Sequence, residues 1–354
     1  MPLPYWAYAI FANKMMRASL FCTNVIFPLH ILLMRSVCTI FVTMKRLLFI
    51  ICYLLFVISS WAQTPIDKPS LRTATLISPY YFGPNAFEVP EMLDGRVQHD
   101  LRVELVGDYF KGYRDDHTAD ARLKVNVPLW TDRANLSVWM PVMEWYRNSD
   151  ENMRVCRIPD ERQAEARKGH LSGDVYVSID MQLMREGLWR GKHKAGVPDW
   201  VLRAALRTAS GGEFYHARYY DGPGYFFDTS LAKSFAVGRN KSWNHNLRLA
   251  LSAGFLCWQT DNGRQNDAVQ FGAMLKWENK HFSLSETLAG YSGWEHNCGN
   301  GGDEAHDRPT VLRTDFRYHI KRFDIVSRYQ YGLRDYPFHQ FQLGLAYHLD
   351  ILKK

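Results

Sequence analysis

The sequence predicts an all-β protein, a transmembrane antiparallel up-and-down β-barrel of about 12 strands that follows a cleaved signal peptide. Three observations lead to this prediction: a repeated alternation of apolar and polar residues, an export leader at Met44, and tight connections that alternate with long ones. The alternation is clearest from Asn246 to Cys257, where Leu247, Leu249 and Leu251 fall on one face and the intervening residues on the other. A period of two residues belongs to a β-strand, not to a helix.

Residues 44–62 have the three parts of a secretory signal peptide. A basic start, Met44-Lys45-Arg46, precedes an apolar core from Leu47 to Ile58, and Ser60-Trp61-Ala62 forms a small-x-small cleavage site. The core is about a dozen residues long, whereas a membrane-spanning helix needs roughly 20. We therefore expect export with cleavage after Ala62, the alternative being a retained membrane anchor. We interpret residues 1–43 as an over-extended reading frame upstream of the true start at Met44.

The net charge argues against nucleic acid as a partner. The chain has 43 Lys and Arg against 36 Asp and Glu, but residues 1–62 hold five basic and no acidic residues. The remaining 38 basic and 36 acidic groups leave a net charge of only +2. A mean hydropathy of -0.29 is too polar for a helical membrane bundle and suits barrel strands that are half apolar.

Residues 63–100 form a proline-rich lead-in. Five prolines in this segment, from Pro65 to Pro90, argue against a central strand or a long helix. We expect this segment to be a periplasmic lead-in or a plug inserted into the lumen, with a merely extended linker as the alternative.

Residues 101–354 contain about twelve strand candidates, each near the 9 to 11 residues that a tilted membrane strand needs. An even number suits a single-chain bacterial barrel. The candidates are Leu101–Lys111, Ala121–Trp130, Leu136–Tyr146, Asp174–Leu183, Val201–Ala209, Gly224–Phe235, Leu247–Trp258, Ala268–Trp277, Phe282–Tyr291, Val311–Ile320, Phe323–Gly332 and Phe341–Leu349.

The connections alternate in length as those of an outer-membrane barrel do, with short periplasmic turns and longer outer loops. Residues 131–134, 278–281 and 321–322 are tight links, while 147–173, 210–223, 259–267 and 292–310 are long and polar or glycine-rich. Two links break the rule: 184–200 is long where a turn is expected, and 335–337 is short where a loop is expected.

A soluble β-sandwich also alternates and can be secreted, so it is the structural alternative. Two features favour the barrel. Aromatic residues gather at strand ends like interfacial girdles, and the last strand resembles the terminal signal of outer-membrane proteins, although Asp350 to Lys354 follow it. The girdle candidates are Trp130, Trp243, Trp258, Trp277 and Tyr347.

The leader, the alternating strands and the motif Ser78-Pro79-Tyr80-Tyr81-Phe82-Gly83-Pro84-Asn85-Ala86 together resemble a poorly characterised group of outer-membrane β-barrel proteins of Bacteroides-like Gram-negative bacteria. The resemblance covers about residues 44–354. It implies a fold and an outer-membrane location, and no defined substrate.

Basic groups outnumber acidic ones on the predicted lumen face. One hypothesis is a narrow porin-like pore for small or anionic solutes, by the logic of charged rings. The alternative is a closed structural or surface-binding barrel whose lumen is plugged and crosslinked by Arg–carboxylate pairs. The predicted pore-lining residues are Arg122, Lys124, Arg203, Arg207, Arg248, Arg313, Asp315, Arg317 and Arg328.

The densest aromatic run lies in the loop from Phe214 to Phe227 around Gly222-Pro223-Gly224. Such residues stack sugars or constrict a pore, or they form an outer interfacial girdle. The predicted aromatic-loop residues are Phe214, Tyr215, Tyr219, Tyr220 and Tyr225.

We expect no enzymatic activity, with an outer-membrane lipid hydrolase as the outside alternative. His281 and Ser283 have the spacing of outer-membrane phospholipases, but Leu284-Ser285 follows in place of Asn-Gly, and strand parity puts His281 at a periplasmic turn. A second candidate group is His216, Asp228 and Ser230.

We expect no cofactor and no metal. Cys156 and Cys298 fall in outer loops, where they form a disulfide or remain free thiols. The expected partners are outer-membrane lipid and the barrel-assembly machinery, with small solutes or surface glycans as candidate ligands and the oligomeric state left open.

Overall fold

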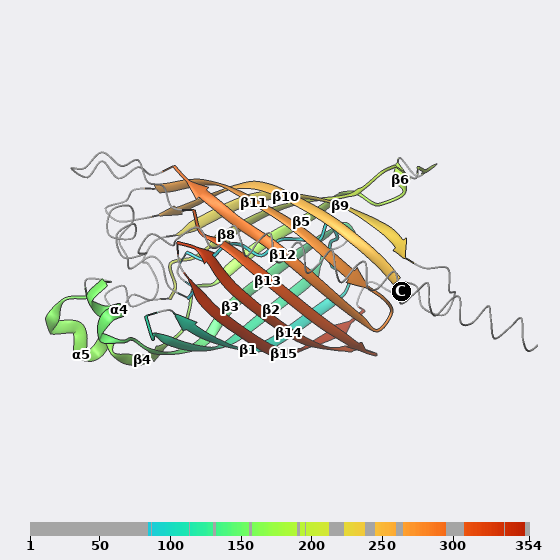
Figure 1. Ribbon diagram of the computed structural model, residues 1–354. Coiled ribbons are helices and arrows are strands. Elements are labelled where there is room, and N and C mark those ends of the chain that lie inside the picture. The colour runs from blue at the N-terminus through green and yellow to red at the C-terminus, as the bar shows by residue number, and fades with distance from the viewer. Residues whose placement is uncertain are drawn as a thin grey trace, which may run out of the picture. The chain divides into compact units, whose positions relative to one another are not determined.

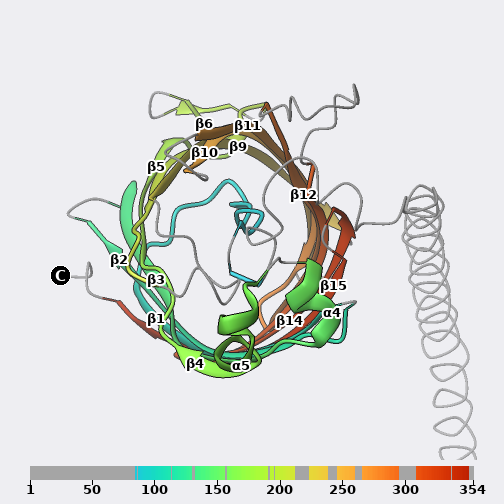
Figure 2. The same ribbon diagram turned by 90° about the vertical axis from the view of Figure 1, so that its left-hand side faces the viewer.

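The computed structural model describes residues 84–350, except 86, 113, 130–131, 156–157, 190–191, 195, 212–222, 238–244, 260–264, 295–307 and 336. These residues belong to one unit, which is a closed antiparallel β-barrel (Figure 1 and Figure 2). The predicted over-extended start, the predicted signal peptide and residues 63–83 of the lead-in lie outside the described residues.

Twelve strands form the barrel wall, which confirms the predicted fold. Each wall strand pairs antiparallel with the next one along the chain, and β1 pairs with β15 from Leu101 opposite Leu349 to Gly112 opposite Phe338. This last pairing closes the ring. The wall strands are β1 (Leu101–Gly112), β2 (His117–Pro128), β3 (Ala134–Arg147), β5 (Tyr176–Met184), β8 (Asp199–Arg207), β9 (Gly224–Val237), β10 (His245–Gln259), β11 (Gln265–Glu278), β12 (Phe282–Gly293), β13 (Thr310–Ile320), β14 (Phe323–Arg334) and β15 (Phe338–Leu349).

The smaller elements lie in two connections. Between β3 and β5 the chain forms α4 (Asp150–Val155), η3 (Asp160–Arg162), α5 (Gln163–Ala166) and β4 (Lys168–Leu171), which extends β3. Between β5 and β8 it forms the hairpin of β6 (Leu188–Trp189) and β7 (Lys192–His193). The hairpin explains why residues 184–200 are longer than a turn. No helix in the described part of the chain is long and apolar enough to cross a membrane.

The barrel has two distinct ends, which we call the loop end and the turn end. The connections after β3, β8, β10 and β12 lie at the loop end, where Figure 1 shows α4, α5 and β4. The tight links 129–133, 279–281 and 321–322 lie at the turn end, where the β6–β7 hairpin also projects. The second strand was predicted at Ala121–Trp130, but β2 begins at His117 and ends at Pro128. The turn that follows it therefore starts two residues earlier than expected.

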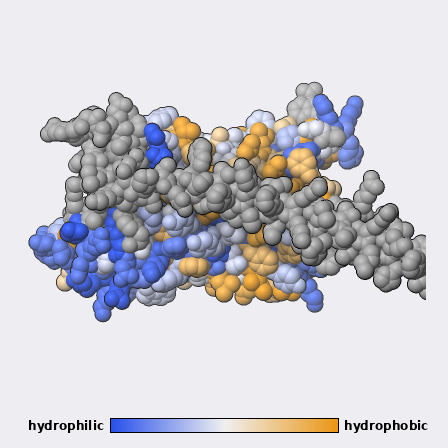
Figure 3. Space-filling view, in the orientation of Figure 1, coloured by the Kyte–Doolittle hydropathy of each residue, from blue (hydrophilic) through white to orange (hydrophobic). Residues whose placement is uncertain are grey.

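The two faces of the wall have opposite polarity. Leu251 and Leu343 on the outward face are each 66% exposed, and Leu105 is 59% exposed, whereas Arg248 on the inward face of β10 is fully buried. Figure 3 shows apolar side chains over the flank of the barrel and hydrophilic ones gathered around the loop end. An apolar outer belt around a polar interior is the arrangement of a barrel in lipid. The soluble-sandwich alternative is wrong, because one closed ring replaces two stacked sheets.

We expect Leu251→Arg to reduce the stability of the barrel in a lipid bilayer by about 2–4 kcal/mol, because it would place a charge at mid-strand on the outward face. The free energy of unfolding from lipid vesicles measures this. Leu188→Arg, in the β6–β7 hairpin beyond the wall, is the matched control and should change it little. An equal response of both variants would argue against a lipid-facing belt.

Candidate functional site

Residues 84–100, which we call the plug, run inside the barrel without forming a helix or a strand (Figure 2). Pro84 and Pro90 each lack a backbone donor for a ladder. Gly95 has a φ of 81°, and a Cβ there would lie 2.7 Å from the Ala232 Cβ on the wall. Only glycine accommodates both this backbone conformation and this close approach.

The plug crosses the whole lumen, from the loop end to the turn end. Near the loop end the side-chain amide of Asn85 donates hydrogen bonds to the carboxylates of Asp120 at 2.5 Å and of Glu144 at 2.9 Å. At the turn end Arg96 donates to Glu278 at 2.8 Å, beside the last residues of β11. Residues 84–100 therefore run from the loop end to the turn end, where β1 begins.

An aromatic anchor holds the plug at the loop end. Phe87 stacks on Trp258 with ring centroids 6.0 Å apart, and the Arg207 guanidinium lies 4.6 Å from the Trp258 ring centroid. The Tyr291 hydroxyl donates to the Phe87 carbonyl at 3.3 Å. The prediction of Trp258 as an interfacial girdle residue is wrong. Trp258 shares the inward face of β10 with Arg248 and is fully buried against the plug.

Charged wall residues hold the middle of the plug. The Glu91 carboxylate pairs with Lys124 at 2.8 Å and with Arg328 at 2.5 Å, and its backbone carbonyl accepts from Arg203 at 2.5 Å. Arg313 donates to the carbonyls of Val89 and, at 3.0 Å, Pro90. Backbone carbonyls of the plug thus accept hydrogen bonds from wall arginines that would otherwise donate to water in an open lumen.

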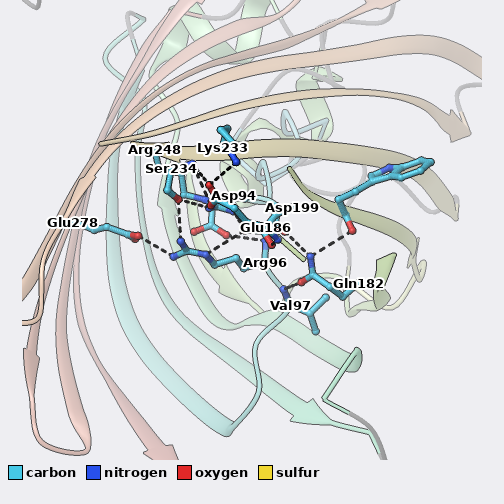
Figure 4. A network of polar contacts seen from close by, with 12 residues as sticks. Asp94, Arg96, Val97, Gln182, Glu186, Asp199, Lys233, Ser234, Arg248 and Glu278 are labelled. Atoms are coloured by element: carbon cyan, nitrogen blue, oxygen red, sulfur yellow. Dashed lines mark hydrogen bonds and ion pairs between the residues drawn. The ribbon is translucent and has the colours of Figure 1, made fainter. Parts of the chain in front are cut away.

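A network of ion pairs and hydrogen bonds holds the plug at the turn end (Figure 4). The Asp94 carboxylate pairs with Lys276 at 2.7 Å, and its backbone carbonyl accepts from Arg248 at 2.8 Å. Arg248 also pairs with Asp199 at 2.7 Å, and Arg96 lies 3.5 Å from the same carboxylate. The fully buried Arg248 therefore connects the plug to two wall strands.

The connection between β5 and β8 contributes to this network. Glu186 accepts from the Ser234 amide at 3.0 Å and lies 3.4 Å from Arg248. Burial opposes its ionisation, but hydrogen bonds from the Ser234 amide and hydroxyl and the nearby Lys233 together lower the pKa of Glu186. The Gln182 side chain accepts from the Val97 amide at 2.9 Å and donates to the Gly95 carbonyl at 2.9 Å. Glu186 is thus a charged partner for the buried guanidinium.

A second polar cluster lies near the loop end around Arg122. The Arg122 guanidinium lies 3.5 Å from Asp108 and 3.7 Å from Asp120, and it donates to the Asn85 side chain. Asp108, Asp120 and Glu144 are all buried. Asn85 and Arg122 together provide the donors that keep these carboxylates from lying unpaired in the wall.

The structure places all nine predicted pore-lining residues toward the lumen, and seven of them contact the plug. The other two, Asp315 and Arg317, pair with Arg328 and Glu104 of the wall. The seven that contact the plug are Arg122, Lys124, Arg203, Arg207, Arg248, Arg313 and Arg328.

Sequence reasoning missed the plug residues that meet these cations. The available signal was the placement of Glu88, Glu91 and Asp94 three residues apart in an extended proline-containing segment. Their partners come from strands far along the chain, and spacing alone does not identify such partners.

Several predicted residues lie outside the described part of the chain: Phe214, Tyr215, Tyr219, Tyr220, His216, Cys156 and Cys298. Tyr225 is described, and it packs against Phe227 and Phe255, which share its face of the wall. Cys257 in β10 is buried and free.

The two hydrolase candidate groups take separate positions. His281 is exposed in the turn before β12, whereas Ser283 is buried in that strand. Asp228 is paired with Arg203 at 2.7 Å in the lumen, and Ser230 is fully buried on the same strand. Among the described residues, no group of three or more His, Cys, Asp or Glu side chains is arranged to hold a metal ion.

Comparisons with known proteins identify no family. No family model and no curated protein matches the chain. Solved structures that resemble it include an outer membrane channel from Pseudomonas putida F1 (12% identity, 74% of this chain and 100% of that one, TM-score 0.48) and the KdgM porin (10% identity, 70% and 99%, TM-score 0.42). The transport unit of the autotransporter AIDA-I from Escherichia coli is also similar (11% identity, 81% and 100%, TM-score 0.41). At these values the likeness carries no information about solute or activity.

We expect Arg248→Met to lower the free energy of unfolding by about 3–5 kcal/mol, because it would leave the Asp199 carboxylate without its closest buried cation. Denaturant titration of the refolded barrel measures the loss. Arg162→Gln, which removes the exposed pair between Arg162 on η3 and Glu165 on α5, is the control and should cost less than about 1 kcal/mol. If the two variants lose stability equally, the network is not a structural requirement.

Proposed function

We propose that this protein is a porin-like channel of a Gram-negative outer membrane, closed at rest by its own plug. The apolar outer belt suits a bilayer, and the leader at residues 44–62 predicts export. Outer-membrane lipid surrounds the wall, and assembly uses the barrel-assembly machinery of that membrane.

One observation carries the proposal: seven of the nine predicted pore-lining residues bind the plug, mostly through ion pairs and hydrogen bonds. Water or a charged solute can replace such contacts, whereas an apolar core has no equivalent substitute. Phe87 and Val89 of the plug join a hydrophobic cluster, and Val97 is also buried. Polar contacts predominate from Glu91 to Arg96, so the plug is most readily displaced there.

Charge supports small or anionic solutes as cargo. Residues 84–97 carry Glu88, Glu91 and Asp94 against the single cation Arg96. Displacing this stretch would remove its net charge of −2 from the lumen. A lumen with exposed guanidinium groups favours anions.

The alternative is a closed structural or surface-binding barrel in which the plug never leaves. The same contacts are compatible with it, because every buried lumen charge needs a partner whether or not anything passes. Conductance separates the two functions, since only the channel responds when the plug is weakened.

We expect Asp94→Asn to raise the frequency of channel openings in planar bilayers at least severalfold over the wild-type protein. The variant removes the 2.7 Å ion pair with Lys276 and preserves the shape of the side chain. Asp132→Asn, which breaks an exposed pair with Arg185 in a turn, is the control and should behave like wild type.

A crosslink tests whether the plug itself is the closing element. A Cβ at Gly272 would lie 2.9 Å from the Met92 sulfur, so Met92→Cys with Gly272→Cys, in a background without the native cysteines, should form a disulfide between plug and wall. The crosslink should silence Asp94→Asn, and reduction should restore its openings. Silence of Asp94→Asn without the crosslink, in a barrel that still shows heat-modifiable migration, would favour the closed barrel.

A further inference from the structure

A pocket lies beside the plug and reaches from the loop end toward the middle of the lumen. It is lined by Pro309 and Phe338, which lie at strand ends, and by Arg328 farther along β14. Charged side chains of both plug and wall line it: Glu88, Glu91, Arg122, Arg313, Arg328 and Arg334.

The charges around this pocket are unevenly compensated. Arg328 pairs with Asp315 at 2.6 Å and with Glu91 at 2.5 Å. Arg122 faces the buried carboxylates of Asp108 and Asp120. Glu88 also lies 3.9 Å from Arg122, so three carboxylates face Arg122 and two face Arg328.

Arg313 differs from both. Only 4% of it is exposed, and its acceptors are the Gln330 side-chain oxygen and the carbonyls of Val89 and Pro90, all of which are neutral. Among the described residues, no carboxylate lies within ion-pair distance of its guanidinium. Neutral acceptors satisfy the hydrogen bonds of this buried guanidinium without a direct ion pair, which is a costly arrangement for a buried cation.

We propose that Arg313 is the centre of a binding site for a small soluble anion that carries a carboxylate or a phosphate group. Hydrogen bonds from a guanidinium to an anion are roughly twice as strong as those between neutral groups. An anion can therefore displace the Val89 and Pro90 carbonyls from Arg313, with Arg328 beside it as the second cation. The carboxylates around Arg122 exclude it from the opposite side.

The occupant is a free solute, because the pocket is lined by the plug and by inward-facing side chains of the wall, not by the outward apolar face. If the protein is the channel proposed above, a bound anion also affects the plug. It replaces the Val89 and Pro90 carbonyls as the partner of Arg313 and competes with Glu91 for Arg328. The middle of the plug is then held less tightly. An acidic solute thereby promotes its own passage.

Isothermal titration calorimetry of the refolded full barrel in a non-ionic detergent tests the site. The probes are inorganic phosphate and succinate, with succinamide as the uncharged counterpart of succinate. We expect at least one anion to bind and succinamide not to bind. Arg313→Gln should weaken anion binding at least tenfold, whereas Arg185→Gln, which removes a cation at a distant turn, should leave it unchanged.

A second variant guards against a merely structural effect of losing Arg313. Gln330→Glu keeps the arginine and gives it an internal carboxylate partner at the position where Gln330 now accepts its Nε hydrogen bond. The same loss of anion binding is expected, together with an intact barrel. Unchanged binding in Gln330→Glu, or equal binding of succinamide and succinate, would overturn the site.

The two experiments test the anion site and the channel function independently. Anion binding that persists while Asp94→Asn stays silent supports the Arg313 site and removes the channel. Openings of Asp94→Asn without measurable binding of phosphate or succinate overturn the site and leave the channel standing.

Discussion

The pairing of β1 with β15 is the constraint on which the rest of the structure depends. Once the ring closes, each wall strand has one face toward the outside and one toward a narrow lumen. The outward face carries Leu105, Leu251 and Leu343, and the inward face carries arginines and carboxylates. Closure therefore forces the charged groups together, and each of them must find a partner inside the barrel.

The plug meets part of that requirement. It brings carboxylates to Lys124, Arg328 and Lys276, and it brings backbone carbonyls to Arg203, Arg248 and Arg313. These contacts stabilise the wall and also obstruct the lumen, so stability and closure rest on the same interactions. A channel of this kind opens only when another partner, water or an anion, takes over some of those contacts.

The arrangement of the plug explains why its two halves differ. At the loop end, Phe87 packs between aromatic and guanidinium groups, while Asn85 and Glu88 face Arg122. Toward the turn end, Asp94 and Arg96 depend on ion pairs. Charged contacts exchange with water or solute more readily than apolar packing does, so the stretch from Glu91 to Arg96 is expected to move before Phe87.

The sequence by itself determined the wall: a period of two residues and the alternation of short and long links located all twelve strands, with the largest error at the start of β2. It also identified the inward arginines, because their parity along each strand is a local property. It misassigned Trp258, whose place at a strand end resembled a girdle although its parity with Arg248 pointed inward. The β6–β7 hairpin was missed because two-residue strands carry no periodic signal.

Only the tertiary structure decided what the lumen contains. Whether residues 84–100 form a linker, a lead-in or a plug depends on contacts such as Arg313 to Val89 and Arg96 to Glu278, between residues more than 180 positions apart. No local pattern encodes such pairs, since charge complementarity becomes specific only when closure of the ring brings the partners into one confined space. The alternation of residues thus determined the wall, and the closed fold determined its occupant.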